Sequence, residues 1–599
     1  MKIKEYYASK NKKIKLCIEN FKTILAFEIF YKLLGLFILL PIVKEIFKFT
    51  LRITGLKIII QNNILEYISK PVIYPFLLLI VMIAGVYVYF EIISFVNITL
   101  YIMKNRCISL FELLEVNIKT LKQQVKPINI FLWVYILLLL PLSFSFLENY
   151  LIVNFAFPSF VLDYFQYNLH LFFFVLVFLL ICFWFTWIWC FVFHFMILKD
   201  MNFLEARKAS SFLWKKNKGK FFKKSFLVFL ISFISKYTIG VWQYACGYIV
   251  YKMRADANLL TLYLIILVYI FINLCIKIAL NIFVFYELSD FYYEYNPVQK
   301  MPKKLKNNKL KALKINLGLN IAMIAIFIFT TWGSLKLKER ITDLDKWGNT
   351  KITAHRGDSI KEIENTLEAF KSAIKSECDY IELDVMLTKD EKLVITHDSN
   401  LKRLTGVNRR VKELTLAEIK ELDIVRNGKK AKFATLDETL DFTSGKIKLN
   451  IELKPDGDDE LLAQRVYEKL RDYDRKDFII SSFSKRALKK MKELDPGIKT
   501  GITMAISIGD KGAFENVDFY SLEESYITRK DIENAHKNNR EVHVWMINSE
   551  SELVYVMHKG VDNVITDYPE IMVKKRDKVL ENKRKYIISY MFQFEISGI

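Results

Sequence analysis

Two acidic side chains that stand two residues apart, in a segment that also supplies two histidines, are the residues best suited to chemistry. Glu382 and Asp384 lie within an apolar run, with His355 before it and His397 after it. Side chains alternate between the faces of a β-strand, so both carboxylates would point the same way while apolar neighbours pack behind them. Two carboxylates on one face repel each other unless a cation lies between them. With two histidines as proton carriers, the segment predicts a metal-assisted hydrolase.

The chain from about residue 350 onward alternates short apolar strands with amphipathic helices. The predicted strands are 351–355, 380–386, 393–397, 447–453, 477–482, 499–504, 517–520, 541–547 and 562–566. This alternation predicts a parallel α/β sheet, and about 250 residues suit a closed (βα)8 barrel of the TIM type. Nine strands are one too many for that barrel. We therefore expect 380–386 and 393–397, which are close in sequence, to pair as a hairpin.

A barrel of this kind carries its active site at the carboxyl ends of the strands. His355 closes the first predicted strand, and the strand LNIELK ends with Glu452 and Lys454. Asn450, Glu452 and Lys454 share one face by alternation. Glu452 thus adds a third carboxylate to the acidic pair, with no cysteine among the candidates. An oxygen-rich set of this kind suits Ca²⁺ or Mg²⁺ rather than structural zinc.

An ordered set of motifs runs through this segment in one direction. It consists of HRG at His355, ENT at Glu364, IELDV, TKD, a strand ending in HD, IELK and a late ITDYP. The set resembles the glycerophosphodiester phosphodiesterase family over about residues 350–572. The hydrophobic half resembles, in arrangement and hydropathy, the membrane domain fused to such catalytic domains in some bacteria. The resemblance implies hydrolysis of glycerophosphodiesters to sn-glycerol 3-phosphate and an alcohol.

The resemblance also implies roles for the residues at matching positions. His355 and His397 would be the acid/base pair, and which of them accepts the proton stays open, as does direct water attack against a cyclic phosphate intermediate. One divalent cation, Ca²⁺ or Mg²⁺, would bind Glu382, Asp384 and Glu452. The other matches are Arg356 and Lys454 as phosphate contacts, Glu364 as a support acting through Arg356, and Trp545 near the substrate pocket.

The sequence departs from the family pattern at positions near the substrate. Ile363 precedes ENT where relatives often have proline, and Lys361 and Glu362 stand where many have small or aromatic residues. The SSFS run at 481–484 lacks the acidic residue often found at its end. None of these changes removes a proposed catalytic group, so the alcohol of the substrate is the part that stays open.

The first half of the chain is strongly apolar. Of 599 residues, 53% are hydrophobic and 15% aromatic, with 48 Phe, and the mean hydropathy is +0.20. A chain of this length exceeds one ordinary domain. Apolar runs near the ~20 residues that cross a bilayer as a helix predict about seven spans, at 22–43, 72–95, 128–147, 171–197, 225–250, 259–286 and 315–334.

Positive charge lies beside these spans. The net charge is +22, and its position favours a membrane rather than nucleic acid as the reason. Residues 127–198 contain no Lys or Arg, whereas 199–224 contain nine and 296–316 contain seven lysines. Because Lys and Arg accumulate on cytoplasmic loops, we expect a cytoplasmic N-terminus and an extracellular catalytic segment after Leu335. Five positive residues in 44–70 conflict with that orientation.

These patterns predict a division into a membrane domain (1–345), a catalytic barrel (346–572) and a basic tail (573–599). The expected substrate is a glycerophosphodiester or another lipid-derived diester met beside membrane lipid, and the oligomeric state is not readable. Two other functions fit less well. One is a phospholipase C- or D-like lipase on the same barrel, and the other is a membrane transporter or receptor whose barrel binds a ligand.

Overall fold

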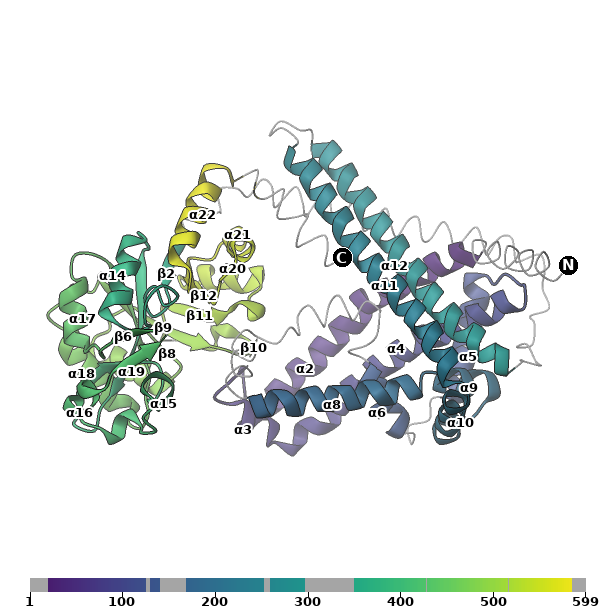
Figure 1. Ribbon diagram of the computed structural model, residues 1–599, viewed down its shortest axis with the longest axis horizontal. Helices are drawn as coiled ribbons and strands as arrows, with labels where there is room; N and C mark the ends of the chain where they lie inside the picture. The colour runs from purple at the N-terminus through teal and green to yellow at the C-terminus, as the bar shows by residue number, and fades with distance from the viewer. Residues whose placement is uncertain are drawn as a thin grey trace.

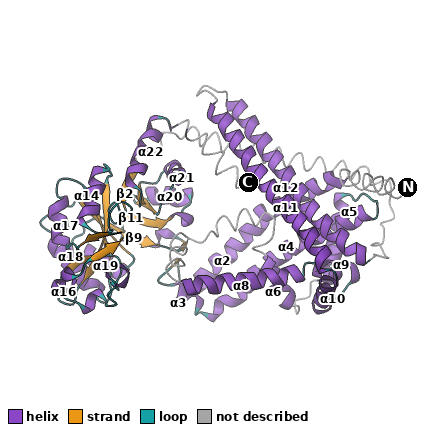
Figure 2. Ribbon diagram, in the orientation of Figure 1, coloured by secondary structure: helices purple, strands orange, loops and turns teal. Residues whose placement is uncertain are grey.

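The computed structural model describes residues 20–124, 130–139, 169–252, 259–296, 350–583 without 427 and 515, and Tyr586. Figure 1 and Figure 2 show a helical region built from the first half of the chain beside a region of strands and helices built from the second half. This order of a helical region followed by a barrel is the predicted fold class, and the prediction is confirmed.

The helical region is made of long apolar helices. Its described helices are η1 (Gly35–Leu39), α2 (Leu40–Thr54), α3 (Ile64–Ile68), η2 (Pro71–Ile73), α4 (Tyr74–Met103), α5 (Leu110–Gln124), α6 (Ile130–Leu139), α8 (Leu169–Ile188), α9 (Val192–Lys199), α10 (Phe203–Lys216), α11 (Lys218–Lys252) and α12 (Leu259–Tyr295). Within the described residues, three helical stretches are long and apolar enough to cross a membrane: Asn20–Thr54, Pro71–Met103 and Phe172–Lys199.

These stretches correspond to the predicted spans 22–43, 72–95 and 171–197. Helices α11 and α12 cover the predicted spans 225–250 and 259–286. Part of 128–147 and all of 315–334 lie outside the described residues, so the number of spans stays a prediction.

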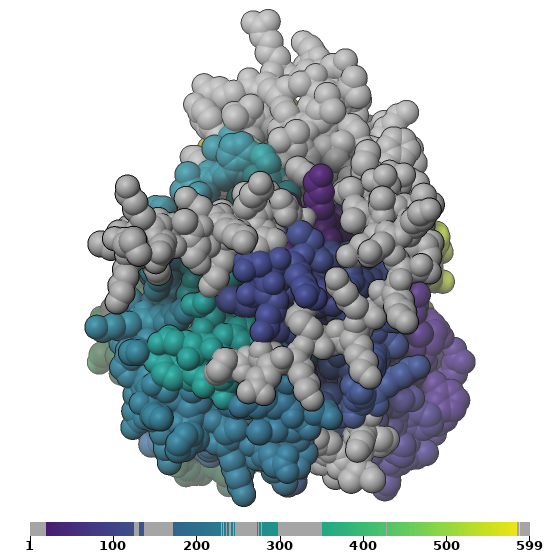
Figure 3. All heavy atoms as spheres, turned by 90° about the vertical axis from the view of Figure 1, so that its right-hand side faces the viewer, coloured from purple at the N-terminus to yellow at the C-terminus, as the bar shows by residue number. Residues whose placement is uncertain are grey.

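Aromatic side chains fill much of the interior between these helices. The Tyr31 and Tyr87 rings stack with centroids 4.0 Å apart, and Phe191 stacks on Phe291 at 5.5 Å. At Gly85 of α4 the Trp133 ring of α6 comes so close that an added Cβ would lie 2.9 Å from it. Figure 3 views this end of the molecule, where the coloured surface nearest the viewer comes from helices of the first half of the chain.

The second region is a closed barrel. Its strands are β2 (Lys351–Ala354), β3 (Tyr380–Leu387), β4 (Leu393–Ile395), β7 (Lys448–Leu453), β8 (Phe478–Ser482), β9 (Thr500–Met504), β11 (Phe519–Glu523), β12 (Glu541–Trp545) and β13 (Asn563–Thr566). Over the described part of 350–583, eight of them are parallel, and the β2–β3 pairing closes the ring. The ninth, β4, pairs antiparallel with β3, with Val385 opposite Ile395. The predicted hairpin is confirmed.

The helices of the barrel follow its strands through short capped turns. They are α14 (Leu367–Lys375), α15 (Lys402–Thr405), η6 (Val411–Glu413), α16 (Leu416–Glu421), α17 (Leu436–Thr443), α18 (Asp459–Leu470), α19 (Lys485–Leu494), η7 (Lys511–Ala513), η8 (Glu524–Tyr526), α20 (Arg529–Lys537), α21 (Glu550–Lys559) and α22 (Pro569–Glu581). Thr366, Asp458 and Ser484 cap α14, α18 and α19 by accepting from backbone N–H groups. Such caps satisfy donors that the first helical turn leaves without partners.

Alternation along β3 separates the barrel wall from its interior. Ile381, Leu383 and Val385 are fully buried in the core cluster that also contains side chains of the surrounding helices. Tyr380, on the other face, packs with Ile479 and Phe519. Glu382 and Asp384 share that face, further along the strand. The strand therefore places its acids at the carboxyl end of the barrel and its tyrosine at the opposite end.

The two regions are joined by a short antiparallel pairing. Strand β1 (Ile58–Ile60), in the loop between α2 and α4, pairs with β10 (Ser507–Gly509), which follows β9 of the barrel. Figure 1 shows β10 on the side of the barrel that faces α2 and α3. A small separate hairpin, β5 (Ile424–Arg426) with β6 (Lys429–Ala431), lies before α17.

Candidate active site

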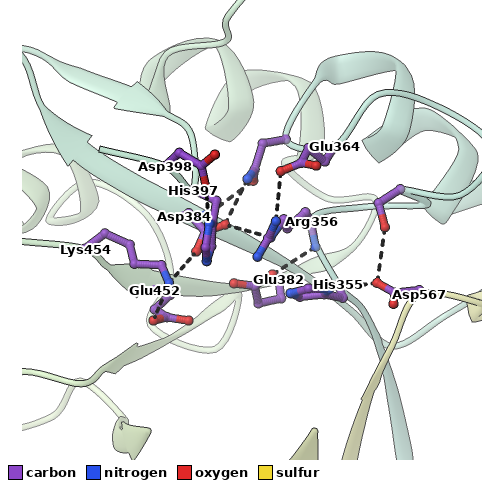
Figure 4. A network of polar contacts seen from close by, with 12 residues as sticks. His355, Arg356, Glu364, Glu382, Asp384, His397, Asp398, Glu452, Lys454 and Asp567 are labelled. Atoms are coloured by element: carbon purple, nitrogen blue, oxygen red, sulfur yellow. Dashed lines mark hydrogen bonds and ion pairs between the residues drawn. The ribbon is translucent and has the colours of Figure 1, made fainter. Parts of the chain in front are cut away.

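Glu382, Asp384 and Glu452 come together at the carboxyl ends of β3 and β7. The parallel register sets Asp384 opposite Glu452, one pair beyond Glu382 and Asn450. One ligand oxygen from each carboxylate lies within 4.8 Å of the others. The residues are only 3%, 1% and 9% exposed. Water therefore screens little of the repulsion between their negative charges. The structure brings the predicted cation ligands into one cluster (Figure 4).

The pKa shifts of the three carboxyl groups indicate why a cation would fit this cluster. Burial, and then the charge of Asp384, raise the pKa of Glu382. Burial also raises the pKa of Glu452. The pKa of Asp384 is lowered although burial opposes it, because Lys454, His397 and Arg356 favour its charged form. Three buried hard oxygen donors whose negative charge is only partly offset match the ligand preference of Ca²⁺ and Mg²⁺.

Arg356 is held over the cluster by the tight HRG turn after β2. Its backbone N–H donates to Glu382 Oε2 at 2.9 Å, and its Nε lies 3.3 Å from Asp384 Oδ2. The turn requires positive φ at Arg356 (54°) and Gly357 (80°). A Cβ at Gly357 would come within 2.8 Å of the Ala369 backbone. Glycine is therefore needed where the turn packs against α14.

Glu364 anchors the guanidinium of Arg356 from behind. Its Oε1 accepts from Arg356 Nη1 at 2.8 Å. Arg403 makes a bidentate contact at 2.7 and 2.8 Å, and Arg426 Nη1 adds one at 3.0 Å. Burial would raise the pKa of Glu364, but hydrogen bonds and charges from Arg403 and Arg356 lower it to about 2. The structure thus places Glu364 against Arg356, as the sequence predicts.

Asn365, next in the ENT motif, is a site residue that the sequence reasoning did not single out. Its Nδ2 donates to Asp384 Oδ2 at 2.9 Å, and its Oδ1 accepts from the Asp384 backbone N–H at 3.3 Å. It adopts a positive φ of 56°, a conformation that asparagine tolerates better than most residues. The ENT motif could have indicated a role for Asn365, because an asparagine directly after Glu364 is typical of a tight polar turn.

His355 and His397 lie on either side of Arg356 in Figure 4, and each is backed by an aspartate. His355 Nδ1 lies 2.8 Å from Asp567 Oδ1, and His397 Nδ1 lies 2.7 Å from Asp398 Oδ1. A carboxylate on Nδ1 selects the tautomer that carries its proton there, which leaves Nε2 for a reacting group. Asp398 belongs to the HD motif and Asp567 to the ITDYP motif, but the sequence alone indicated no role for either residue.

The surroundings of the two histidines shift their pKa values in opposite directions. Burial and Arg356 lower the pKa of His355, but the charge and hydrogen bond of Asp567 more than offset them, so the net shift is upward. Burial, Lys454 and Arg356 lower the pKa of His397 to about 4. The pKa values of the two rings are therefore shifted in opposite directions, which suits one to accept a proton and the other to donate one.

Lys454 and Trp545, the remaining predicted site residues, both lie near Phe483. Lys454 Nζ is 3.2 Å from Glu452 Oε1 and 3.4 Å from Asp384 Oδ1. The Trp545 ring, at the end of β12, packs edge-on against Phe483 with centroids 6.3 Å apart. Lys454 also lies 5.5 Å from the centre of the Phe483 ring. Phe483 therefore links the predicted phosphate contact to the predicted pocket tryptophan.

A cleft of about 960 Å³ opens beside His397 and Lys454. It is lined by Ile60, Asn62, Asn63, Met386, His397, Asp398, Ser399, Asn400, Leu453, Lys454, Pro455, Asp456, Asp459, Phe483, Ser484, Lys485 and Arg486. Most of these residues follow β4, β7 or β8, but the first three come from the loop between α2 and α4. The cleft is large enough for a small organic phosphodiester.

Comparison with known families agrees with this geometry. The model of the glycerophosphoryl diester phosphodiesterase family matches residues 355–571, and that of the membrane domain of glycerophosphoryl diester phosphodiesterase matches residues 10–332. The second match alone covers more than half of the chain. The chain belongs to the glycerophosphoryl diester phosphodiesterase family. It is a membrane protein and a phosphoric diester hydrolase, which excludes the purely ligand-binding alternative.

Individual relatives match less than half of the chain. A glycerophosphodiester phosphodiesterase of Caldanaerobacter subterraneus is 34% identical over 237 residues, 37% of this chain and 96% of the relative. A human lysophospholipase D is 34% identical over 137 residues, 21% of this chain and 42% of that protein. Among solved structures, an Oleispira antarctica phosphodiesterase in complex with the product sn-glycerol-3-phosphate is 28% identical, with a TM-score of 0.35, over 38% of this chain and 96% of that one.

Proposed function

We propose that this phosphodiesterase hydrolyses glycerophosphodiesters to sn-glycerol 3-phosphate and an alcohol by cation-assisted acid/base catalysis. The observation that carries the proposal is the grouping of the buried carboxylates Glu382, Asp384 and Glu452 with two aspartate-backed histidines around Arg356. Family membership and the match to a relative of that name agree with it.

The proposed roles follow from the chemistry of a phosphodiester, which is anionic and has a poor alkoxide leaving group. Glu382, Asp384 and Glu452 would hold Ca²⁺ or Mg²⁺, whose positive charge would offset the negative charge that builds on the phosphoryl oxygens. Arg356 offers a planar fork to two phosphate oxygens, and Lys454 adds a second positive charge. One of His355 and His397 accepts the proton of the nucleophile, and the other donates to the departing alcohol oxygen. Trp545 shapes the alcohol side through Phe483.

The orientation proposed from the loops is a cytoplasmic N-terminus and an extracellular barrel. Helix α10, part of the lysine-rich segment 199–224, lies at the end of the helical region away from the barrel (Figure 1), which supports this orientation. The loop after α2 contacts the barrel, so the positive residues of 44–70 near it share the barrel's side. We propose that the nine positive residues of 199–224, rather than the five of 44–70, determine the orientation in the membrane. Protease treatment of intact cells should then remove the barrel, and protection of the barrel would reverse the orientation.

We keep the proposed division into an anchoring membrane domain (1–345), a catalytic barrel (346–572) and a basic tail (573–599). Helix α22 runs from Pro569 to Glu581, so the first turns of the tail continue the last helix of the barrel. In this arrangement the membrane domain keeps the active site close to lipid-derived diesters.

The test is a product assay on the full-length enzyme in detergent micelles with Ca²⁺ or Mg²⁺. Glycerophosphocholine and glycerophosphoglycerol should each release glycerol 3-phosphate, and chelation should stop the release. A His355→Ala variant with unchanged activity would refute the assignment of the site.

A second candidate is lysophospholipase D activity on the same barrel, which the partial match to the human relative favours. In that reaction the same bond type is cut, but the phosphate stays on an acylated glycerol. Incubation with lysophosphatidylcholine, followed by phosphorus NMR, separates the two activities, since lysophosphatidate forms only in the second.

A further inference from the structure

One wall of the active-site cleft comes from the membrane region rather than from the barrel. Ile60, Asn62 and Asn63, in the loop between α2 and α4, line the same cleft as His397 and Lys454. The contact joins residues far apart in the chain, since Asn62 and Phe483 are separated by 421 positions. A catalytic barrel of this class usually supplies its own cleft from the loops at the carboxyl ends of its strands.

The loop is built into the barrel by strand pairing. Ile58, Ile59 and Ile60 of β1 pair in register with Gly509, Ile508 and Ser507 of β10. Ile58 and Ile60 are buried in the main core of the barrel, whereas Ile59 packs in the other direction, with Leu51 of α2 and Tyr67 of α3. This alternation, expected of a strand, inserts the loop between the two regions and fixes its position.

The two residues after β1 hold the loop over the cleft through hydrogen bonds to the barrel backbone. Gln61 Oε1 accepts from the backbone N–H groups of Ala505 and Ile506 at 3.1 and 3.4 Å. Asn62 Nδ2 donates to the carbonyl of Phe483 at 2.9 Å. Asn62 thus lines the same cleft as Lys454 and Phe483, and the Phe483 ring in turn contacts Lys454 and Trp545.

Gly509 makes this close approach possible. Its φ is 129°, and a Cβ there would come within 2.7 Å of the Lys57 carbonyl oxygen and 2.9 Å of Ile58 Cα. Any other residue would push β1 away from β10. A substitution at Gly509 should therefore move the loop without changing a residue that lines the cleft.

The charges along the cleft indicate which kind of alcohol it accepts. Its acids are neutralised by the protein: Asp456 pairs with Arg410 and Lys412, Asp459 with Arg486, and Asp398 with Arg403. A quaternary ammonium head group would therefore meet little uncompensated negative charge. Asn62, exposed and with only its Nδ2 engaged by Phe483, presents Oδ1 as an acceptor for a hydroxyl group.

We propose that Asn62 is a specificity-determining residue that the membrane region contributes to the active site. It binds a hydroxyl of the departing alcohol and makes the enzyme prefer a hydroxylated alcohol such as glycerol over a trimethylammonium alcohol such as choline. The inference rests on the proposed function, because it names the alcohol of that same reaction. The membrane region then selects the substrate in addition to anchoring the barrel.

The test compares kcat/KM for glycerophosphoglycerol and glycerophosphocholine in the full-length enzyme in detergent micelles. The wild type should prefer the first, and Asn62→Ala should lower the ratio of the two values about tenfold, the effect of one well-placed hydrogen bond. The matched control is Glu66→Ala, in α3 of the same loop and paired with Lys70 outside the cleft. It should keep the wild-type ratio.

Gly509→Val provides an independent variant, because it displaces the loop and leaves Asn62 in the sequence. It should lower the same ratio. A ratio that stays within about twofold of the wild type in Asn62→Ala, while both diesters are still cleaved, would overturn this inference and leave the proposed function intact. A wild-type enzyme that cleaves neither diester would instead overturn the proposed function.

Discussion

The active site has two parts that are built differently. One is the carboxylate cluster, which we call the cation end, and the other is the cleft beside His397 and Lys454, which we call the alcohol end. At the cation end, Glu382 and Asp384 are almost fully buried, and neighbouring strands set their positions through the β3–β7 register. At the alcohol end, Asn62 and Lys485 line an open cleft formed by loops, one of them from the membrane region. Strand register tolerates little change, whereas loops can differ without loss of the barrel. We therefore expect catalysis and substrate selection to depend on separate parts of this molecule.

The largest effect is expected at the cation end. His355→Ala removes a proton carrier and should lower kcat by about 10³-fold, within the usual range for a general acid or base. Steady-state kinetics on glycerophosphoglycerol with saturating cation measure the loss, and circular dichroism checks the fold. A loss confined to KM would place His355 in substrate binding instead.

A smaller loss should follow from removing the partner of that histidine. Asp567→Asn keeps the size of the side chain but withdraws the charge that holds the pKa of His355 up. We expect kcat to fall by about 10²-fold and the limb of the pH–rate profile that reports His355 to move to lower pH. Ser359→Ala is the control, because Ser359 also contacts Asp567 but not the histidine ring. A profile that does not move would show that Asp567 only supports the loop.

Cation affinity should depend on pH with a definite sign. The pKa of Glu382 is raised, so the cation-free site retains a proton at pH values where an ordinary carboxyl group has lost it. Because the cation binds the ionised form, its affinity should rise with pH, by up to tenfold per pH unit for each proton displaced. Titration calorimetry with Ca²⁺ at pH 6, 7 and 8 measures it. An affinity independent of pH would argue against Glu382 as a ligand.

The smallest effect is expected at the alcohol end. Phe483→Leu keeps an apolar side chain but loses the ring that packs against Trp545 and Lys454. We expect KM to rise two- to fivefold, a loss of roughly 0.5–1 kcal/mol that is typical of an aromatic contact, with little change in kcat. If kcat falls as far as in Asp567→Asn, the two ends are not separable and the comparison above fails.

Much of the fold could be predicted from the sequence because strands and hairpins are recognised by the alternation and spacing of apolar residues over a few positions. Period-two alternation placed Ile381, Leu383 and Val385 in the wall of the barrel and Glu382 on the opposite face, and the structure agrees. The short spacing between two apolar strands predicted the antiparallel β4 partner.

The motifs predicted the carboxylates and the histidines of the candidate site, but not the side chains that support them. Asp567 and Asp398 stood in quoted motifs, but nothing local shows that each would lie within hydrogen-bonding distance of a histidine ring. Asn365 was passed over for the same reason, since its contact with Asp384 spans two elements.

Local sequence pattern was enough to show which residue types could bind a cation and move protons. It also showed the order of strands and helices and the separation into an apolar half and a catalytic half. These properties follow from side-chain chemistry and from periods of two or a few residues. The folded protein was needed to show that Glu452 stands opposite Asp384 and that Asn62 of the first half borders the cleft of the second. Both depend on strand pairing between distant segments, β3 with β7 and β1 with β10. Register between distant strands follows from the packing of the whole barrel, not from either strand alone.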